Sequence, residues 1–188
     1  MADLKSEIEW TLSSSGRIPR EKVVKWIEEA GDLRTLSLLY RLTDVDYHRV
    51  EPELGRDATC GLIQRYLLEC MRERVSDDEE ILEGFDAART LNAWFLHLLQ
   101  KGGNEDVLRT AAGAVTELFL NGDEGLQNLI ETGFLEHVLD TEGLRPYFEH
   151  WATDDRLRSV WEPALAWGKA HPDQMAQIFG LSRHKKPE

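Results

Sequence analysis

The chain has 188 residues, of which 41% are hydrophobic and 30% are charged, and its formal net charge is −13 with a pI near 4.9. This composition is typical of one globular domain and not of a disordered chain. The negative charge argues against a nucleic-acid or anionic-membrane surface, because both attract clustered lysine and arginine. It is compatible with a basic protein partner, and solubility alone explains it equally well.

The sequence shows neither the pattern of a secretion signal nor that of a membrane span. The first ten residues, "MADLKSEIEW", are acidic and lack the apolar region of a signal peptide, and no apolar run reaches the roughly 18 residues of a membrane span. Cys60 and Cys70 lie in one stretch of helical periodicity, so a helix would place them about 15 Å apart, too far for a disulfide. We predict free thiols in a reducing compartment, and therefore a cytoplasmic location.

Helical periodicity dominates the chain from its start. Residues 3–14 form an amphipathic pattern with Leu4, Ile8 and Leu12 on one face. Further helices are predicted from apolar residues at helical spacing within 61–71, 91–99 and 107–119, and alternation typical of strands is almost absent. The sequence therefore predicts an all-α fold.

Glycines punctuate this pattern at similar intervals. Gly31, Gly84 and Gly133 each follow a short helical pattern and precede an apolar residue. We predict that each glycine takes a left-handed conformation that ends a short helix and turns the chain into a second helix. A longer third helix then follows each time, in the segments "RDATCGLIQRYLLECMR", "EDVLRTAAGAVTELFLN" and "DDRLRSVWEPALAWGKA". The chain thus divides into three units of about 50 residues.

This order of helices resembles the armadillo repeat, the three-helix unit of α-solenoids, with HEAT-type helix pairs as the near alternative. The resemblance implies one domain over residues 1–181, an α-α superhelix of about three repeats with a capping helix at each end. The ranges are 1–18 for the N-terminal cap, 19–74, 75–122 and 123–171 for the repeats, 172–181 for the C-terminal cap and 182–188 for a disordered basic tail. The pattern departs from the family at a Pro-containing insertion, 44–54, and at Pro146 and Pro163, which interrupt helices of the third repeat.

No motif of the sequence points to catalysis, a metal or a cofactor, so none is predicted and the chain is expected not to be an enzyme. No two histidines are spaced to form a metal-binding face on a helix. We interpret His97 as a core residue and the pairs at 136–137 and 149–150 as surface residues. The acidic run "SDDEE", 76–80, is interpreted as a helix cap because it lacks the ligand spacing of a calcium loop. Most of the six tryptophans are expected in the core, with one of the three in the last repeat as a candidate exposed binding residue.

The resemblance implies a protein-interaction module that binds a protein partner on a concave surface lined by the third helices. The asparagine ladder of peptide-gripping armadillo proteins is missing, because Glu117 and Arg65 stand at ladder positions, so nuclear-import-type binding is not expected. The candidate binding residues are Arg65, Glu69, Glu117 and Asn121. We expect Arg65→Glu and Glu117→Arg to weaken binding without changing the melting temperature.

Two other classes of function stay open from the sequence. The first is a small acidic immunity or inhibitor protein that blocks a basic toxin or nuclease, since negative charge steers association with a basic protein. The second is an enzyme on a helical scaffold, which a deep pocket with a perturbed carboxylate or histidine would support.

Overall fold

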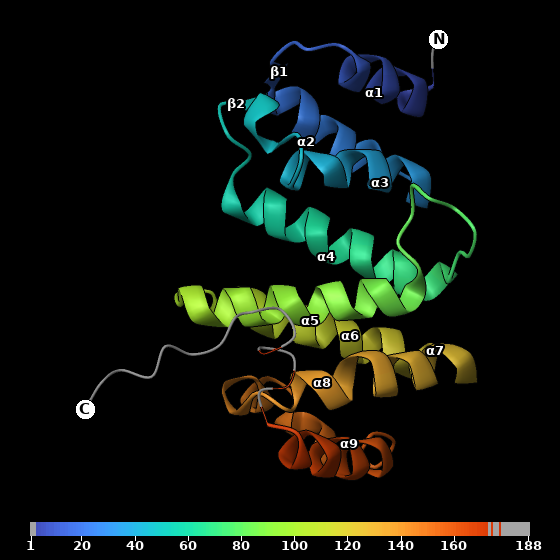
Figure 1. Cartoon of the computed structure of the whole chain (residues 1–188), viewed down its shortest axis with the longest axis vertical. Helices are drawn as coiled ribbons and strands as arrows, with labels where there is room; N and C mark the ends of the chain where they lie inside the picture. Colours follow the sequence, from blue (N-terminus) through green and yellow to red (C-terminus); the bar gives the residue numbers. More distant parts are fainter. Residues whose placement is uncertain (1–2, 173, 175–176, 178–188) are drawn as a thin grey trace. The chain divides into compact units, whose positions relative to one another are not determined.

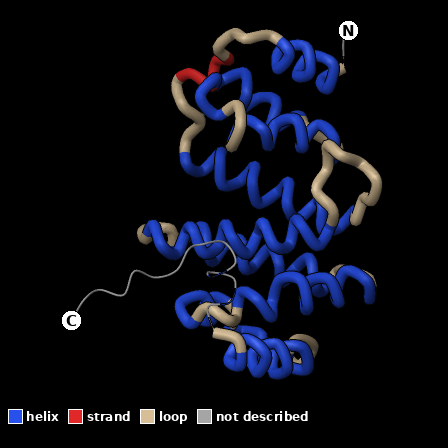
Figure 2. The backbone as a smooth tube through the Cα atoms, viewed as in Figure 1, coloured by secondary structure: helices blue, strands red, loops and turns tan. Residues whose placement is uncertain are grey.

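The computed structural model describes residues 3–172, 174 and 177, and its regular structure is almost entirely helical (Figures 1 and 2). The chain forms two compact units, residues 1–83 and 84–188. Within the described part, strands are limited to one parallel pair of two residues each, β1 (Ile18–Pro19) and β2 (Val50–Glu51). The predicted all-α fold class is confirmed. None of the helices in the described ranges is both long and apolar enough to span a membrane.

The first unit is organised around a short central helix. Its elements are α1 (Leu4–Ser13), α2 (Arg20–Glu29), α3 (Leu33–Tyr40), the 3-10 turns η1 (Arg41–Thr43) and η2 (Tyr47–Arg49), and α4 (Arg56–Glu73). Helix α3 packs against α1, α2 and α4, and buries Leu36 and Leu39. The carboxylate of Asp32 starts α3 by accepting a hydrogen bond from the Thr35 amide at 2.9 Å. The predicted helix at 3–14 is confirmed as α1, with Asp3 as its cap.

The insertion at 44–54 is fixed to the end of α1 by one buried arginine. Arg49 is 8% exposed, and its guanidinium donates to the carbonyl oxygens of Thr11, Leu12 and Ser14 at 2.6–2.9 Å. These carbonyls lie at the C-terminal end of a helix, where a positive charge is favourable. The insertion is therefore an ordered part of the first unit.

The second unit is built around the long helix α5. Its elements are α5 (Gly84–Lys101), α6 (Glu105–Leu120), α7 (Glu124–Leu129), the π-helical η3 (Ile130–Leu135), α8 (Glu136–Val138), the 3-10 turns η4 (Glu142–Tyr147) and η5 (Glu149–Ala152), and α9 (Arg158–Ala170). Phe95, Phe134 and Phe148 form an aromatic core with ring centroids 5.4–5.9 Å apart. The buried Trp151 adjoins it and donates its indole N–H to the Thr116 hydroxyl at 2.9 Å.

The predicted role of the glycines is wrong. Gly84 is the first residue of α5, and the short helix expected before it is absent. Gly133 lies inside a helical stretch that continues from α7 through η3 to α8, and it has no positive φ. A Cβ at Gly133 would lie 3.0 Å from the Phe85 ring and 3.3 Å from Ala88, so this glycine permits α5 to approach closely. Gly31 does lie in the turn between α2 and α3, but not in the left-handed conformation.

The three-copy order of helices is consequently not reproduced. Residues 19–74 contain a short helix, a second helix and a long helix as predicted, whereas 75–122 lack the first helix and 123–171 have the first two fused through the π-helical turns. Helix α9 continues through Pro163, so the proline does not end the helix. The predicted C-terminal helix and basic tail, 172–181 and 182–188, lie outside the described residues apart from positions 172, 174 and 177.

Candidate functional site

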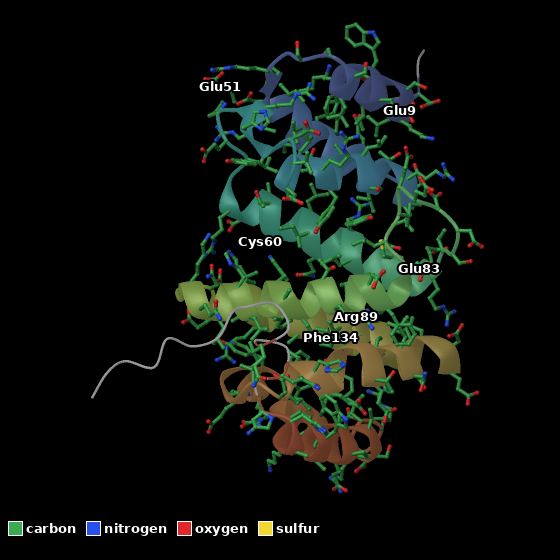
Figure 3. All side chains as sticks on the ribbon, in the orientation of Figure 1. Glu9, Glu51, Cys60, Glu83, Arg89 and Phe134 are labelled. Atoms are coloured by element: carbon green, nitrogen blue, oxygen red, sulfur yellow. The ribbon has the colours of Figure 1, made fainter. Side chains whose placement is uncertain are left out.

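The segment that follows α4, residues 74–83, is non-helical and is held on the first unit by side chains of α3 and α4. Arg74 adopts a left-handed conformation, φ 49°, at the end of α4. Three hydrogen bonds fix the segment: Arg34 Nη2 to Asp78 Oδ2 at 2.6 Å, Ser37 Oγ to the Glu80 carbonyl oxygen, and the Leu82 amide to the Tyr66 hydroxyl at 3.2 Å. It ends at Glu83, labelled in Figure 3. The acidic run 76–80 is thus not the helix cap that we predicted.

This segment separates two hollows in the surface of the first unit. Ile81, which is 7% exposed, lines both of them. The arginine hollow has a volume of about 610 Å³ and lies between the α2–α3 turn, the end of α4 and the segment. The tyrosine hollow, about 430 Å³, lies between the end of α3, the turn after it and the other side of the segment.

The arginine hollow contains three arginines, and each one is bound within the protein. Arg34 pairs with Asp78, and Arg72 pairs with Glu69 at 3.0 Å. Arg65 donates to the Ile27 carbonyl oxygen at 2.9 Å and also to the carbonyl oxygen of Ala30, at the end of α2. Because its cations are engaged in this way, the arginine hollow is a structural junction and offers little free charge to an anion.

The four sequence-predicted binding residues fall into two separate pairs. Arg65 and Glu69 both line the arginine hollow, where both are partly buried. Glu117 and Asn121 are exposed on the second unit, and the Asn121 amide donates to the Glu117 carbonyl oxygen at 2.8 Å. The guanidinium of Arg65 ties α4 to α2, and binding of a partner at Arg65 and Glu69 stays a prediction. Binding at Glu117 and Asn121 stays a prediction.

The tyrosine hollow is lined mainly by apolar and aromatic side chains. Tyr40 and Tyr66 stack with ring centroids 4.5 Å apart and an interplanar angle of 28°. Burial raises the pKa of Tyr66 to about 12, and burial together with the nearby Asp44 carboxylate raises the pKa of Tyr40. Both phenols are therefore neutral at physiological pH. The remaining apolar lining comes from Leu38, Val45, Ile81 and Leu82.

Three exposed carboxylates, those of Asp44, Glu79 and Glu80, also line the tyrosine hollow. Arg41 is the one basic residue in this lining, and it pairs with Asp46 rather than with any of the three. From residue 76 to residue 83 the chain carries five carboxylates and no basic residue. We call Asp44, Glu79 and Glu80 the acidic rim.

The one arginine in the lining, Arg41, does not neutralise the rim. Its guanidinium binds the Asp46 carboxylate at 3.1 Å, and Asp46 also pairs with Arg49 at 3.5 Å. This chain of ion pairs belongs to the scaffold that holds the insertion against α1. The rim therefore keeps a net negative charge beside an apolar surface.

Other reactive side chains show no arrangement for catalysis. Burial raises the pKa of the Cys70 thiol to about 11, which makes it a poor nucleophile. In the described part of the chain, no three histidine, cysteine, aspartate or glutamate side chains gather in a way that could hold a metal ion. The two cysteines are free thiols, as predicted; Figure 3 labels Cys60 on α4.

Two interpretations of histidines and one of tryptophans need correction. His97 is exposed and not part of the core, because it lies on the outer side of α5. His137 is half-buried with its ring edge 4.8 Å from the Trp167 ring, and burial lowers its pKa. The exposed tryptophan is Trp10 on α1, at 74%, and not one of the three in the last predicted repeat.

The tyrosine hollow is not among the sequence-based predictions. Tyr66 falls within the helical pattern predicted over 61–71, and Asp44 is the first residue of the Pro-containing insertion, 44–54. One signal was available: the acidic run 76–80 continues into Ile81 and Leu82 without helical periodicity or a basic residue. An acidic segment that carries its own apolar anchors is typical of an ordered surface segment rather than a helix start.

Comparison with known proteins identifies a family but no characterised relative. No curated protein and no solved structure is detectably similar to the chain. The model of one family, described as a domain of unknown function, matches residues 62–165, more than half of the chain. The match begins within α4 and ends within α9. The chain therefore belongs to the DUF7674 family.

Proposed function

We propose that the chain is a protein-interaction module and that its first unit binds a basic segment of a protein partner at the tyrosine hollow. The observation that carries this proposal is the acidic rim, three exposed carboxylates that line an apolar and aromatic hollow. An enzymatic role has less support, because neither hollow is lined by a histidine or a cysteine.

The apolar lining of the tyrosine hollow and the acidic rim have complementary roles in binding. The apolar lining supplies free energy when a partner's side chain removes it from water. Val45 in the lining is 67% exposed, and Tyr47, two residues along the chain, is 60% exposed. The rim and the overall charge of −13 accelerate the approach of a basic partner and disfavour acidic ones.

The proposal is tested by capture from native lysate with the purified chain as bait. The triple variant Asp44→Asn, Glu79→Gln, Glu80→Gln removes the rim charge while keeping the size of each side chain. We expect quantitative mass spectrometry to show partners that bind the wild type and are depleted about tenfold on the variant, since each charge of a binding site contributes on the order of 0.5–1 kcal/mol.

A matched control separates the rim from bulk charge. Glu28→Gln, Glu53→Gln and Asp77→Asn neutralise three exposed carboxylates that line neither hollow. The control chain should retain the same partners, and their contact region should be a basic segment. Equal depletion on both variants would show that net charge alone drives capture, and no depletion on the rim variant would refute the proposed site.

A more specialised form of this function is an inhibitor of a basic toxin or nuclease. The four exposed carboxylates within 76–83 lie on a segment that three hydrogen bonds fix on the unit, and they favour this form because they present a pre-ordered acidic surface. A captured partner with an enzymatic activity that the wild-type chain blocks one-to-one, and the rim variant does not, would select this form.

A further inference from the structure

The group that enters the tyrosine hollow can be identified from the chemistry of its lining, and this step rests on the proposed function. We propose that the hollow takes the side chain of an arginine of the partner, with its guanidinium stacked on Tyr40 and hydrogen-bonded to the acidic rim. The juxtaposition that carries this is a stacked tyrosine pair beside carboxylates from two different segments of the chain.

The tyrosine pair forms a fixed aromatic wall. Tyr66 is 2% exposed, and its hydroxyl accepts a hydrogen bond from the Leu82 amide, so its ring cannot move freely. Tyr40 stacks on it at 4.5 Å and is only partly buried. A flat group that lies against Tyr40 would therefore extend an existing stack on a surface that is ordered before binding.

The carboxylates approach the hollow from two directions along the chain. Asp44 belongs to the turn that follows α3, whereas Glu79 and Glu80 belong to the segment after α4. Asp44 and Tyr40 line the same hollow, and the negative charge of Asp44 contributes to the raised pKa of Tyr40. A cation that stacks on Tyr40 would therefore lie in a hollow that also contains the Asp44 carboxylate.

These two features favour a guanidinium over an ammonium group. A guanidinium is planar, stacks on aromatic rings, and carries five N–H donors in one plane that can serve carboxylates on more than one side. An ammonium group is compact and strongly hydrated, so it loses more water for the same contacts. The apolar residues Leu38 and Val45, which also line the hollow, can cover the methylene stem of an arginine.

The test uses three tripeptides with blocked termini, in which the central residue between two glycines is arginine, lysine or citrulline. Citrulline is the neutral isostere of arginine. Each peptide is titrated into the full chain, and the chemical shifts of backbone amides and tyrosine rings are followed by NMR. The dissociation constant of the arginine peptide should be about fivefold lower than that of the lysine peptide, and citrulline should bind at least about tenfold more weakly than arginine.

Variants separate the ring from the charge. Tyr40→Leu should remove the preference for arginine over lysine, and Tyr40→Phe should keep it, because a phenyl ring still stacks. Asp44→Asn should weaken arginine binding about threefold, in the range of an exposed ion pair, whereas Asp77→Asn, in the acidic run 76–80 and outside the hollow, should leave it unchanged. If Tyr40→Leu does not fold, the Asp44→Asn and Asp77→Asn pair still decides whether the site is the hollow.

The outcomes distinguish this inference from the proposed function. Lysine binding at the hollow as tightly as arginine would overturn the arginine assignment and leave a basic partner in place. Citrulline binding as tightly as arginine would overturn both, since charge would then play no part. Tighter binding of free arginine than of the tripeptide would point to a small molecule and overturn the assignment to a partner's side chain.

Discussion

Replacing Arg65 by methionine should destabilise the first unit by about 3 kcal/mol. The guanidinium donates to the Ile27 and Ala30 carbonyl oxygens, which lie at the end of α2 where such oxygens lack partners within the helix. A hydrogen bond to a charged group contributes about 1.5–3 kcal/mol, and we take the lower value for each because Arg65 is only partly buried. Methionine keeps the apolar stem, so the loss isolates the two bonds.

Arg65→Glu should cost more than Arg65→Met. A carboxylate there would face the negative end of the α2 dipole and add about 0.5–1 kcal/mol to the loss. The sequence-based expectation that Arg65→Glu leaves the melting temperature unchanged is therefore replaced by a clear decrease.

Hydrogen exchange of the α2 amides, followed by mass spectrometry, reports the change locally, and urea unfolding followed by circular dichroism gives the free energy. The control is Arg72→Met, which breaks an exposed ion pair with Glu69 and should cost about 0.5 kcal/mol. If Arg65→Met and Arg72→Met have the same effect within about 0.5 kcal/mol, then Arg65 does not hold α2 to α4.

Three further predictions concern packing and pH. Gly168→Ala should destabilise the second unit by about 3 kcal/mol, because its Cβ would lie 2.6–2.8 Å from backbone atoms that cannot rotate away. Gly113→Ala, whose Cβ would have nothing within 4 Å, should stabilise the unit by about 0.5–1 kcal/mol. Thermal unfolding compares the two variants. Gly133→Ala should cost little, since the nearby Phe85 ring is 47% exposed and can shift, but Gly133→Val should lower the melting temperature by several degrees, about the effect of 1–3 kcal/mol. Burial raises the pKa of Tyr66 from 10.0 to about 12. The contribution of Tyr66 to the free energy of unfolding is therefore complete below pH 10 and is lost as the pH rises toward 12. Urea midpoints in this range should fall for the wild type and fall less for Tyr66→Phe.

Much of the fold could be predicted because helical periodicity is a local property of the sequence. The helix at 3–14 and the apolar stripe within 61–71 are written in neighbouring residues, and both are confirmed. The role of Gly133 could not be predicted in this way. Gly133 lies against Phe85 and Ala88, which are more than forty residues away in sequence, and in the sequence a glycine at a close contact looks the same as a glycine that ends a helix.

The candidate site depends even more on distant contacts. The repeat pattern predicts Arg65 on the concave surface, because it adjoins the buried stripe of α4. The carbonyl oxygens that accept its hydrogen bonds belong to the end of another helix, α2, which the local pattern does not reveal. The tyrosine hollow arises where α3, the turn after it and the segment after α4 meet, so no single stretch contains it. Local rules predict the acidic run 76–80 as a helix cap. The structure shows instead that side chains of α3 and α4, those of Arg34, Ser37 and Tyr66, bind the segment that contains it.

The central claim, that a basic partner segment binds at the tyrosine hollow, is tested most directly by photo-crosslinking. A benzophenone amino acid at Val45, exposed and in the lining of the hollow, is compared with the same group at Trp10, which is more exposed and lines neither hollow. We predict that Val45 yields an adduct with one partner, that the adduct maps to an arginine-containing segment, and that the acidic-rim variant abolishes it. Equal labelling from Trp10, or an adduct that survives neutralisation of the rim, would contradict the claim.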